Sequence, residues 1–110
     1  MSDIETIEIS IEQAKAVIET ANALDRLHEN KDFQAIFLEG YMKSHVLRNV
    51  GLKASFGAQD EKTQKYIDAQ IMGVGSLQQY IAGVYQKANA AVTSIVADEE
   101  EMETLLEEEV

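Results

Sequence analysis

The stretch between Lys62 and Leu106 constrains the fold most, because its apolar residues follow a heptad repeat. These residues recur at alternating steps of three and four and form a heptad seam of Val74, Leu77, Ile81, Val84, Ala88, Ala91, Ile95, Met102 and Leu105. Asp98 alone interrupts the series. Such spacing keeps one side of a helix turned towards a partner helix. The sequence therefore predicts a long C-terminal helix whose seam needs partners.

The composition agrees with an all-α chain. Its 110 residues include no proline and no cysteine. A lack of proline is typical of long uninterrupted helices, and this length suits a single domain with one core. Without cysteine, neither a disulfide framework nor a cysteine-ligated zinc site can form. No cofactor and no metal site is predicted.

The formal net charge of -11 is concentrated at the two ends of the chain. Residues 1–12 contain four acidic residues and no basic one, and residues 98–109 contain eight acidic residues and no basic one. Residues 13–97 hold the other eight acids and all nine lysines and arginines. Acidic ends repel phosphates, so direct nucleic-acid binding is disfavoured and basic partners are easier to accommodate.

Nothing in the chain indicates a membrane span or a targeting segment. No run of about eighteen apolar residues exists. The first residues, Met1-Ser2-Asp3-Ile4-Glu5, are acidic where a signal or transit peptide would be basic. The expected location at synthesis is inside the cell, with no membrane partner.

Three helices are expected. Ser10-Ile11-Glu12-Gln13 has the form of a capping box and predicts a helix over residues 10–29, preceded by an extended acidic arm over 1–9. A second helix is expected over 32–49 and a third over 61–107. Short loops favour an antiparallel helical hairpin packed on the long C-terminal helix. The corresponding domains are the arm, a helical domain over 10–97 and an acidic helical tail over 98–110.

The segment Gly73-Val74-Gly75 leaves two structures open. It lacks the preceding strand, third glycine and distant acid of a dinucleotide-binding loop. Either the helix bends here, with Ser76 capping a fourth helix, or it runs through and the glycines allow helix two to approach closely. The heptad seam continues through this segment without a change in its spacing, which favours a continuous or merely bent helix.

The predicted core belongs to both hairpin helices and to the first half of the long helix. It comprises Ile18, Leu24, Leu27, Phe33, Phe37, Tyr41, Leu47, Ile67, Ile71 and Leu77. A hairpin of helices about 30 Å long cannot cover a helix of about 70 Å. The uncovered half would then need a second copy of the chain or another protein. The residues expected at that interface are Val84, Ala88, Ala91, Val92, Ile95, Met102, Leu105 and Leu106.

The acidic tail has two interpretations. Crowded carboxylates at a helix C-terminus oppose the helix dipole, so the tail is first expected to be a solvated end that frays. Alternatively, Met102, Leu105 and Leu106 form an apolar stripe that would dock on a basic protein with a hydrophobic groove.

No residue is assigned a catalytic or cofactor-binding role. His28 and His45 each lack the further ligands that a metal site requires. The basic group of Lys43, His45, Arg48 and Lys53 fits charge complementing a helix C-terminus better than phosphate recognition. A non-enzymatic protein is expected.

Several short segments resemble those of short acidic helical proteins of tailed bacteriophages. They are Ala23-Leu24-Asp25-Arg26-Leu27, Asn30-Lys31-Asp32-Phe33, Leu38-Glu39-Gly40-Tyr41, Ile67-Asp68-Ala69 and Gly75-Ser76-Leu77-Gln78-Gln79-Tyr80. Lys31 departs from the pattern, in which a proline would follow the asparagine. The resemblance implies a virion or assembly context and a helical structural or assembly protein acting through protein–protein contacts, in a homo-oligomer or with another phage protein. The alternative is a small acidic inhibitor that mimics nucleic acid or binds a basic host protein.

Overall fold

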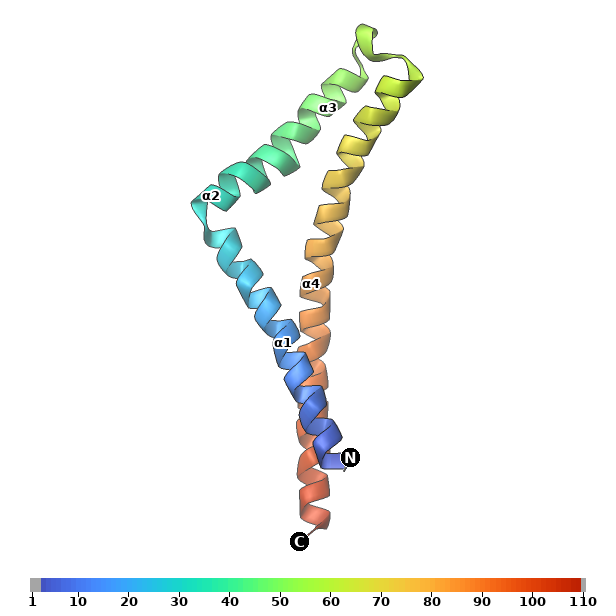
Figure 1. The fold of residues 1–110 in the computed structure, drawn as a ribbon. Helices are drawn as coiled ribbons and strands as arrows, with labels where there is room; N and C mark the ends of the chain where they lie inside the picture. The colour runs from blue at the N-terminus through green and yellow to red at the C-terminus, as the bar shows by residue number, and fades with distance from the viewer. Residues whose placement is uncertain (1–2, 110) are drawn as a thin grey trace. The chain divides into compact units, whose positions relative to one another are not determined.

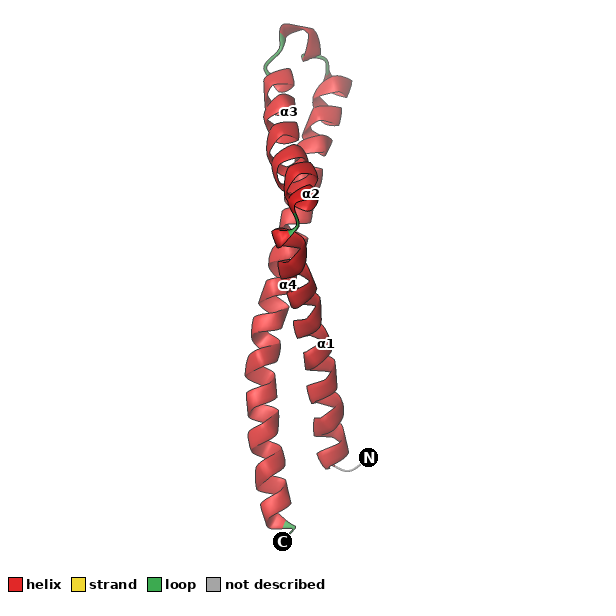
Figure 2. Cartoon of the chain, turned by 90° about the vertical axis from the view of Figure 1, so that its left-hand side faces the viewer, coloured by secondary structure: helices red, strands yellow, loops and turns green. Residues whose placement is uncertain are grey.

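The structure, a computed structural model, describes residues 3–109 and is helical almost throughout (Figures 1 and 2). The elements in order are α1 (Asp3–Glu29), α2 (Lys31–Phe33), the π-helix η1 (Gln34–Ser44), α3 (His45–Lys53), the short 3-10 helix η2 (Phe56–Ala58) and α4 (Glu61–Glu108). No strand occurs within the described residues. Since α2, η1 and α3 follow one another without a break, the chain forms three main helical segments. The predicted all-α fold, with N-terminal helices packed on a long C-terminal helix, is confirmed.

The first helix is longer than the sequence predicts. The prediction of an extended arm over residues 1–9 is wrong for the described part of that range, because α1 already begins at Asp3. Asp3 and Glu5 lie in its first turn, where carboxylates favour the positive end of the helix dipole. Ile7 and Ile11 are buried and, with the half-buried Ile4, continue the apolar stripe of α1 towards the N-terminus. Ser10 is therefore an interior residue of the helix and not its N-cap.

The second segment begins with a cap and continues as a π-helix. Asn30 caps it by accepting a hydrogen bond at its side-chain oxygen from the backbone N–H of Phe33, at 2.9 Å. In η1 the N–H of His45 bonds to the carbonyl of Gly40, five residues back, which is the pattern of a π-helix. A Cβ atom on Gly40 would lie only 3.1 Å from the carbonyl oxygen of Ala35. Glycine at this position therefore fits the close approach of that carbonyl.

Two glutamines hold the turn between α3 and α4. The Gln59 side chain donates to the carbonyls of Lys53 at 3.0 Å and Ser55 at 2.7 Å. The Gln64 side chain donates to the carbonyls of Lys53 at 3.0 Å and Ala58 at 2.8 Å. The carbonyls of Lys53 and Ala58 lie at helix ends, where a carbonyl lacks a partner within its own helix, and these bonds satisfy them.

Asp60 caps the start of α4. Its Oδ2 accepts from the backbone N–H of Thr63 at 3.0 Å and from the Thr63 hydroxyl at 2.8 Å. Both bonds favour the ionised carboxylate, so they lower the pKa of Asp60 below its ordinary value of 3.8. Asp60 and Thr63 therefore form the cap of α4 together.

The long helix α4 runs from Glu61 to Glu108 without interruption, so the glycine segment neither ends it nor starts a fourth helix. A Cβ atom on Gly73 would lie 3.3 Å from the Tyr41 hydroxyl, so the close approach of the second segment occurs there. Nothing lies within 4 Å of the corresponding positions on Gly75 and Gly83. The predicted close approach is therefore right for Gly73 alone.

The chain divides into two compact units, each two helices thick. Unit 1 contains residues 1–25 and 82–110, and unit 2 contains residues 26–81. In unit 1, α1 lies beside the C-terminal part of α4, and in unit 2 α3 approaches the N-terminal part of α4, while α2 stands apart from it (Figure 1). The acidic tail is the last part of α4 in unit 1, and Val110 lies outside the described residues.

The core therefore differs from the predicted one. Ile67 and Val74 are each only 2% exposed and anchor unit 2, whereas Leu27, Phe37 and Leu47 are 47%, 44% and 64% exposed. The prediction that these three belong to the core is wrong. A helix with a single neighbour can bury only one stripe of its surface, so the rest of a largely apolar helix stays exposed.

Candidate interaction surfaces

Most of the predicted interface residues face α1 within unit 1. Ala88 and Ala91 are each 7% exposed, and Val84, Ile95, Met102 and Leu105 are half-buried. Val92 and Leu106, which lie outside the heptad seam, are 53% and 47% exposed. The prediction that this half of α4 lacks cover within the chain is wrong. The physical reason is that α1 packs beside this half of α4 within unit 1.

A hydrogen bond explains the single break in the heptad seam. The Ser10 hydroxyl donates to Oδ2 of Asp98 at 2.7 Å, and both side chains are half-buried. Ser10 itself lies among the inward-facing residues of α1, next to the buried Ile11. The polar residue in one helix thus meets the polar residue in the other, which satisfies both groups within an apolar contact.

A second hydrogen bond closes the other end of unit 1. The Tyr85 hydroxyl donates to Oδ1 of Asp25 at 2.7 Å. This bond, together with desolvation and the negative charge of Asp25, raises the pKa of Tyr85 above its ordinary value of 10.0. Advancing along α1 from Ser10 to Asp25 corresponds to moving back along α4 from Asp98 to Tyr85. The two bonds therefore mark one antiparallel register.

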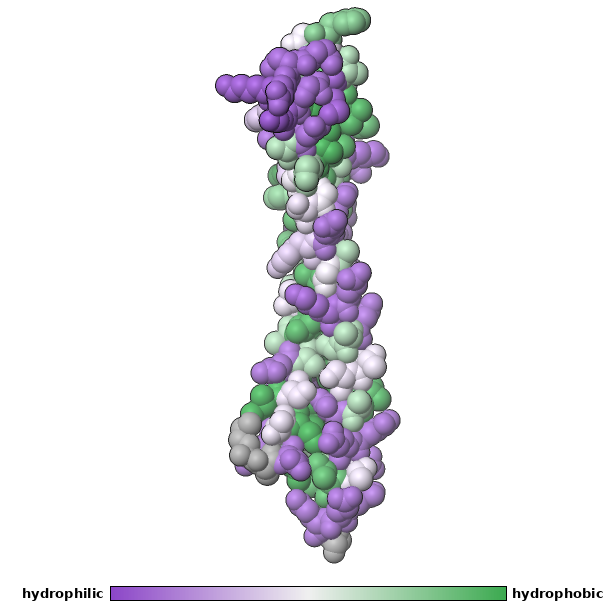
Figure 3. Space-filling model, turned by 90° about the vertical axis from the view of Figure 1, so that its right-hand side faces the viewer, coloured by the Kyte–Doolittle hydropathy of each residue, from purple (hydrophilic) through white to green (hydrophobic). Residues whose placement is uncertain are grey.

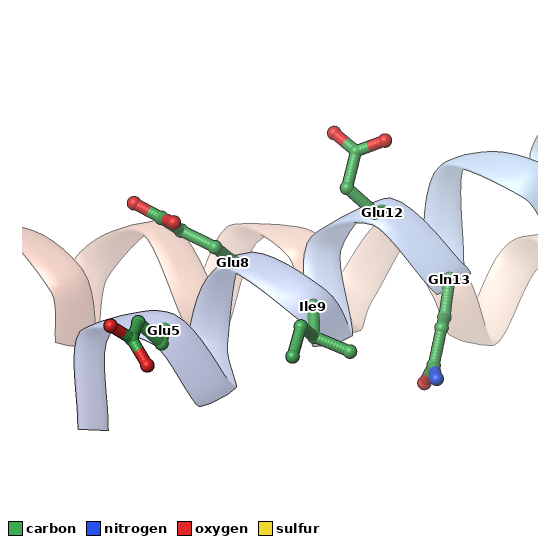
Figure 4. Close-up of a pocket in the computed structure, with 5 residues that line it drawn as sticks. All are labelled: Glu5, Glu8, Ile9, Glu12 and Gln13. Carbon is green, nitrogen blue, oxygen red and sulfur yellow. The ribbon is translucent and has the colours of Figure 1, made fainter. Parts of the chain in front are cut away.

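The packing of unit 1 brings both acidic ends of the chain into one unit. Its residues include fourteen acids and only two bases, Lys15 and Lys87, whereas unit 2 has six acids and seven bases. Two shallow hollows in unit 1 combine carboxylates with apolar side chains. One is lined by Glu5, Glu8, Ile9, Glu12 and Gln13 of α1 (Figure 4), and the other by Glu99, Met102, Glu103, Leu106 and Glu107 of α4. Such surfaces suit a basic protein that also presents apolar groups.

Unit 2 carries a row of aromatic rings on its second segment. The rings of Phe33 and Phe37 stack with centroids 5.2 Å apart, and those of Tyr41 and His45 stack at 5.3 Å. Each pair is four residues apart, a spacing that also brings side chains together in an α-helix. The ring of His28 meets the edge of Phe33 at 5.5 Å.

Asn49 is the one buried polar residue among those described, at 4% exposure. Its amide donates to the carbonyl oxygen of His45 at 2.8 Å and lies 3.4 Å from the ring nitrogen Nε2 of the same residue. The amide is thus satisfied one turn back within its own helix.

The basic group predicted near the end of the second segment is held by structural contacts. Lys43 pairs with Glu39 at 3.8 Å, and Lys53 forms an ion pair with Asp68 of α4. His45 is engaged by Tyr41 and Asn49. Of the four residues, Lys53 lies in the last turn of α3, where its charge can complement the helix C-terminus. Within residues 3–109, no group of three or more histidine or acidic side chains is arranged to hold a metal ion.

Further exposed apolar residues lie on unit 2 and were missed by the sequence interpretation. The largest exposed fractions among them are those of Phe56 (101%), Met72 (71%), Tyr80 (70%), Tyr66 (66%), Leu47 (64%) and Ile36 (63%). For Met72 and Tyr80, the signal available in the sequence was the absence of any charged residue between Asp68 and Lys87, which a helix solvated on its outer side rarely shows. None of the described helices combines the length and apolar character needed to cross a membrane.

Comparison of the chain with protein-family models, with curated proteins and with solved structures finds no match. The surfaces themselves therefore carry the functional argument.

Proposed function

We propose that this is a non-enzymatic helical structural or assembly protein that acts through protein–protein contacts. The observation that carries the proposal is the amount of large apolar surface left exposed on units only two helices thick. Leu47, Tyr66 and Met72 are each more than three-fifths exposed, and all lie in unit 2. Large apolar side chains left exposed in this way are the candidate contacts of a protein interface.

The narrower proposal is that these contacts form during assembly of a tailed-phage particle. Its support is the resemblance of segments such as Asn30-Lys31-Asp32-Phe33 and Leu38-Glu39-Gly40-Tyr41 to short acidic helical phage proteins. On this proposal the protein is made in the host cytoplasm and its partner is another copy or another particle protein.

A second candidate function is supported by the acidic surface of unit 1. Fourteen acids against two bases, with Met102 and Leu106 between carboxylates, suit the binding of a basic host protein or the mimicry of nucleic acid. Unit 2, however, is close to neutral, so the charge covers only part of the molecule.

The salt dependence of the protein's association distinguishes the two candidate functions. A tagged copy is produced in its native source, and the extract is fractionated by density gradient at low and high salt. Co-sedimentation with a large assembly that persists at high salt, where exposed charge pairs are screened, supports the assembly function. Release into a small complex at high salt supports the acidic binder instead, and migration as free protein under both conditions overturns the assembly function.

A further inference from the structure

The middle of α4 exposes a surface that carries no charge. Between Asp68 and Lys87 there is no charged residue, and Asp68 itself is paired with Lys53. Yet Met72 and Tyr80 in this stretch are 71% and 70% exposed. Figure 3 shows green and pale surface interleaved with the polar purple side chains on the face in view. The solvent-facing side of a helix normally carries charged residues. The composition of this side is instead typical of a helix surface that is buried against another protein.

A second heptad series runs along this stretch, separate from the buried one. It steps by three and four through Tyr66, Ala69, Gly73, Ser76, Tyr80 and Gly83, which are named here the tyrosine seam. Each member is exposed or half-buried, whereas Ile67 and Val74 of the neighbouring series are buried against the second segment. Two heptad series on one helix are expected where it packs against two different helices.

The residues of the tyrosine seam follow a similar order in both directions along the helix. Tyr66 and Tyr80 each lie seven residues from Gly73, and Ala69 and Ser76 lie on either side of it. Reversing the helix about Gly73 therefore brings tyrosine onto tyrosine, and it places Ala69 and Ser76, which lie four and three residues from Gly73, within one residue of each other. An interface between identical copies related by a two-fold axis requires this kind of self-complementarity.

We propose that the tyrosine seam is the contact between two copies of this chain, whose α4 helices pack antiparallel about a two-fold axis near Gly73. Tyr66 then packs against Tyr80 of the partner subunit, and Ala69 and Ser76 let the two helices approach beside the Tyr41 hydroxyl that flanks Gly73 within each chain. This inference rests on the proposed function, because it names the partner and the surface of the protein–protein contact.

The charge distribution favours a second copy as the occupant. The seam is uncharged and unit 2 holds six acids against seven bases, so two copies can meet there without repulsion. A contact through unit 1 would bring together two surfaces with fourteen acids each.

Sedimentation equilibrium of the full chain and two matched variants tests the contact. Ser76→Glu places a carboxylate in the seam, where burial without a partner should weaken the dimer at least about 100-fold. Ala82→Glu adds the same charge to the same uncharged stretch at another exposed position, outside the seam, and should leave the dimer unchanged. Neither site has a charged residue four positions away on α4. Circular dichroism of each variant shows that the helices remain folded.

A compensating variant tests the direction of packing. In antiparallel helices Ser76 lies near Ala69 of the partner subunit, so adding Ala69→Lys to Ser76→Glu should restore the dimer. In parallel helices each introduced charge would face the same charge on the partner subunit, so the dimer would weaken further. A wild-type monomer, a silent Ser76→Glu, an equal loss with Ala82→Glu, or failure of the compensating variant would each overturn the proposed contact. None of these outcomes would affect co-sedimentation with a large assembly, which tests the proposed function separately.

Discussion

At the scale of single residues, burial in this chain depends on which stripe of a helix meets its one neighbour. Ile67 is 2% exposed, whereas the equally apolar Leu47 is 64% exposed. The heptad series of α4 predicted the inward position of Val74 and Leu77, but Phe37 and Leu47 were also expected inside. Helix two is apolar over more than half its circumference, so its sequence alone does not distinguish the stripe that faces α4 from the stripe that faces solvent.

Substitutions at these two residues should separate core from surface. Ile67→Ala removes buried methyl and methylene groups and should lower the free energy of unfolding by about 2–5 kcal/mol, with Ile67→Val costing about 0.5–1.5 kcal/mol. Leu47→Ala should change it by less than about 0.5 kcal/mol. Urea denaturation followed by circular dichroism measures all three. Similar losses for Leu47→Ala and Ile67→Ala would contradict the assignment of the core.

Asp60 gives the start of α4 a dependence on pH. Because the Thr63 bonds lower the pKa of Asp60, its contribution is complete above the ordinary value of 3.8 and is lost as the pH falls through the lower, folded value. Amide exchange at Thr63 should therefore become faster, relative to the middle of α4, only at acid pH. Asp60→Asn keeps an acceptor for the cap without the titration, so an unchanged acid response in this variant would show that another group is responsible.

At the scale of elements, the helices were predictable but their partners were not. Three helical segments were expected, and the structure extends the first back to Asp3 and the second to Lys53. Which helix covers which half of α4 could not be read from the pattern, because heptad seams of alanine and branched aliphatic residues pack against one another interchangeably. Ser10 and Asp98 carried the missing information, since each interrupts an apolar stripe and a polar residue there needs a polar partner.

The Ser10–Asp98 bond should contribute to stability and also set the register of α1 on α4. Ser10→Ala leaves the half-buried carboxylate without this donor and should cost about 0.5–1.5 kcal/mol. Combining it with Asp98→Leu makes both stripes apolar, so the double variant should recover that loss or exceed the wild type. It should also populate a second register, visible as doubled resonances of α1 residues. A double-mutant cycle with no coupling between the two sites would show that the bond does not contribute to stability.

At the scale of the whole molecule, the exposed uncharged surface and most of the negative charge lie in different units of the chain. The number of copies could not be derived from the length of α4, because α1 covers the half that was expected to be bare. The exposed uncharged side lies instead in unit 2, around Met72 and Tyr80. Charge is concentrated in unit 1, where the antiparallel packing brings the N-terminal acids into the same unit as the acidic end of α4. The two units should therefore respond differently to salt.

Unit 1 should become more stable as salt is added, while unit 2 changes little. Repulsion among fourteen acids acts over about 30 Å at 0.01 M salt and over only about 3 Å at 1 M. Amide exchange of buried residues such as Ile11 and Ala91 should therefore slow markedly between these concentrations, whereas exchange at Ile67 should stay nearly constant. Ile67 serves as the internal control, because salt also strengthens apolar contacts and would then slow exchange in both units alike. Equal slowing in the two units would mean that the gathered acids do not limit the stability of unit 1, and that its helix pair tolerates their repulsion already at low salt.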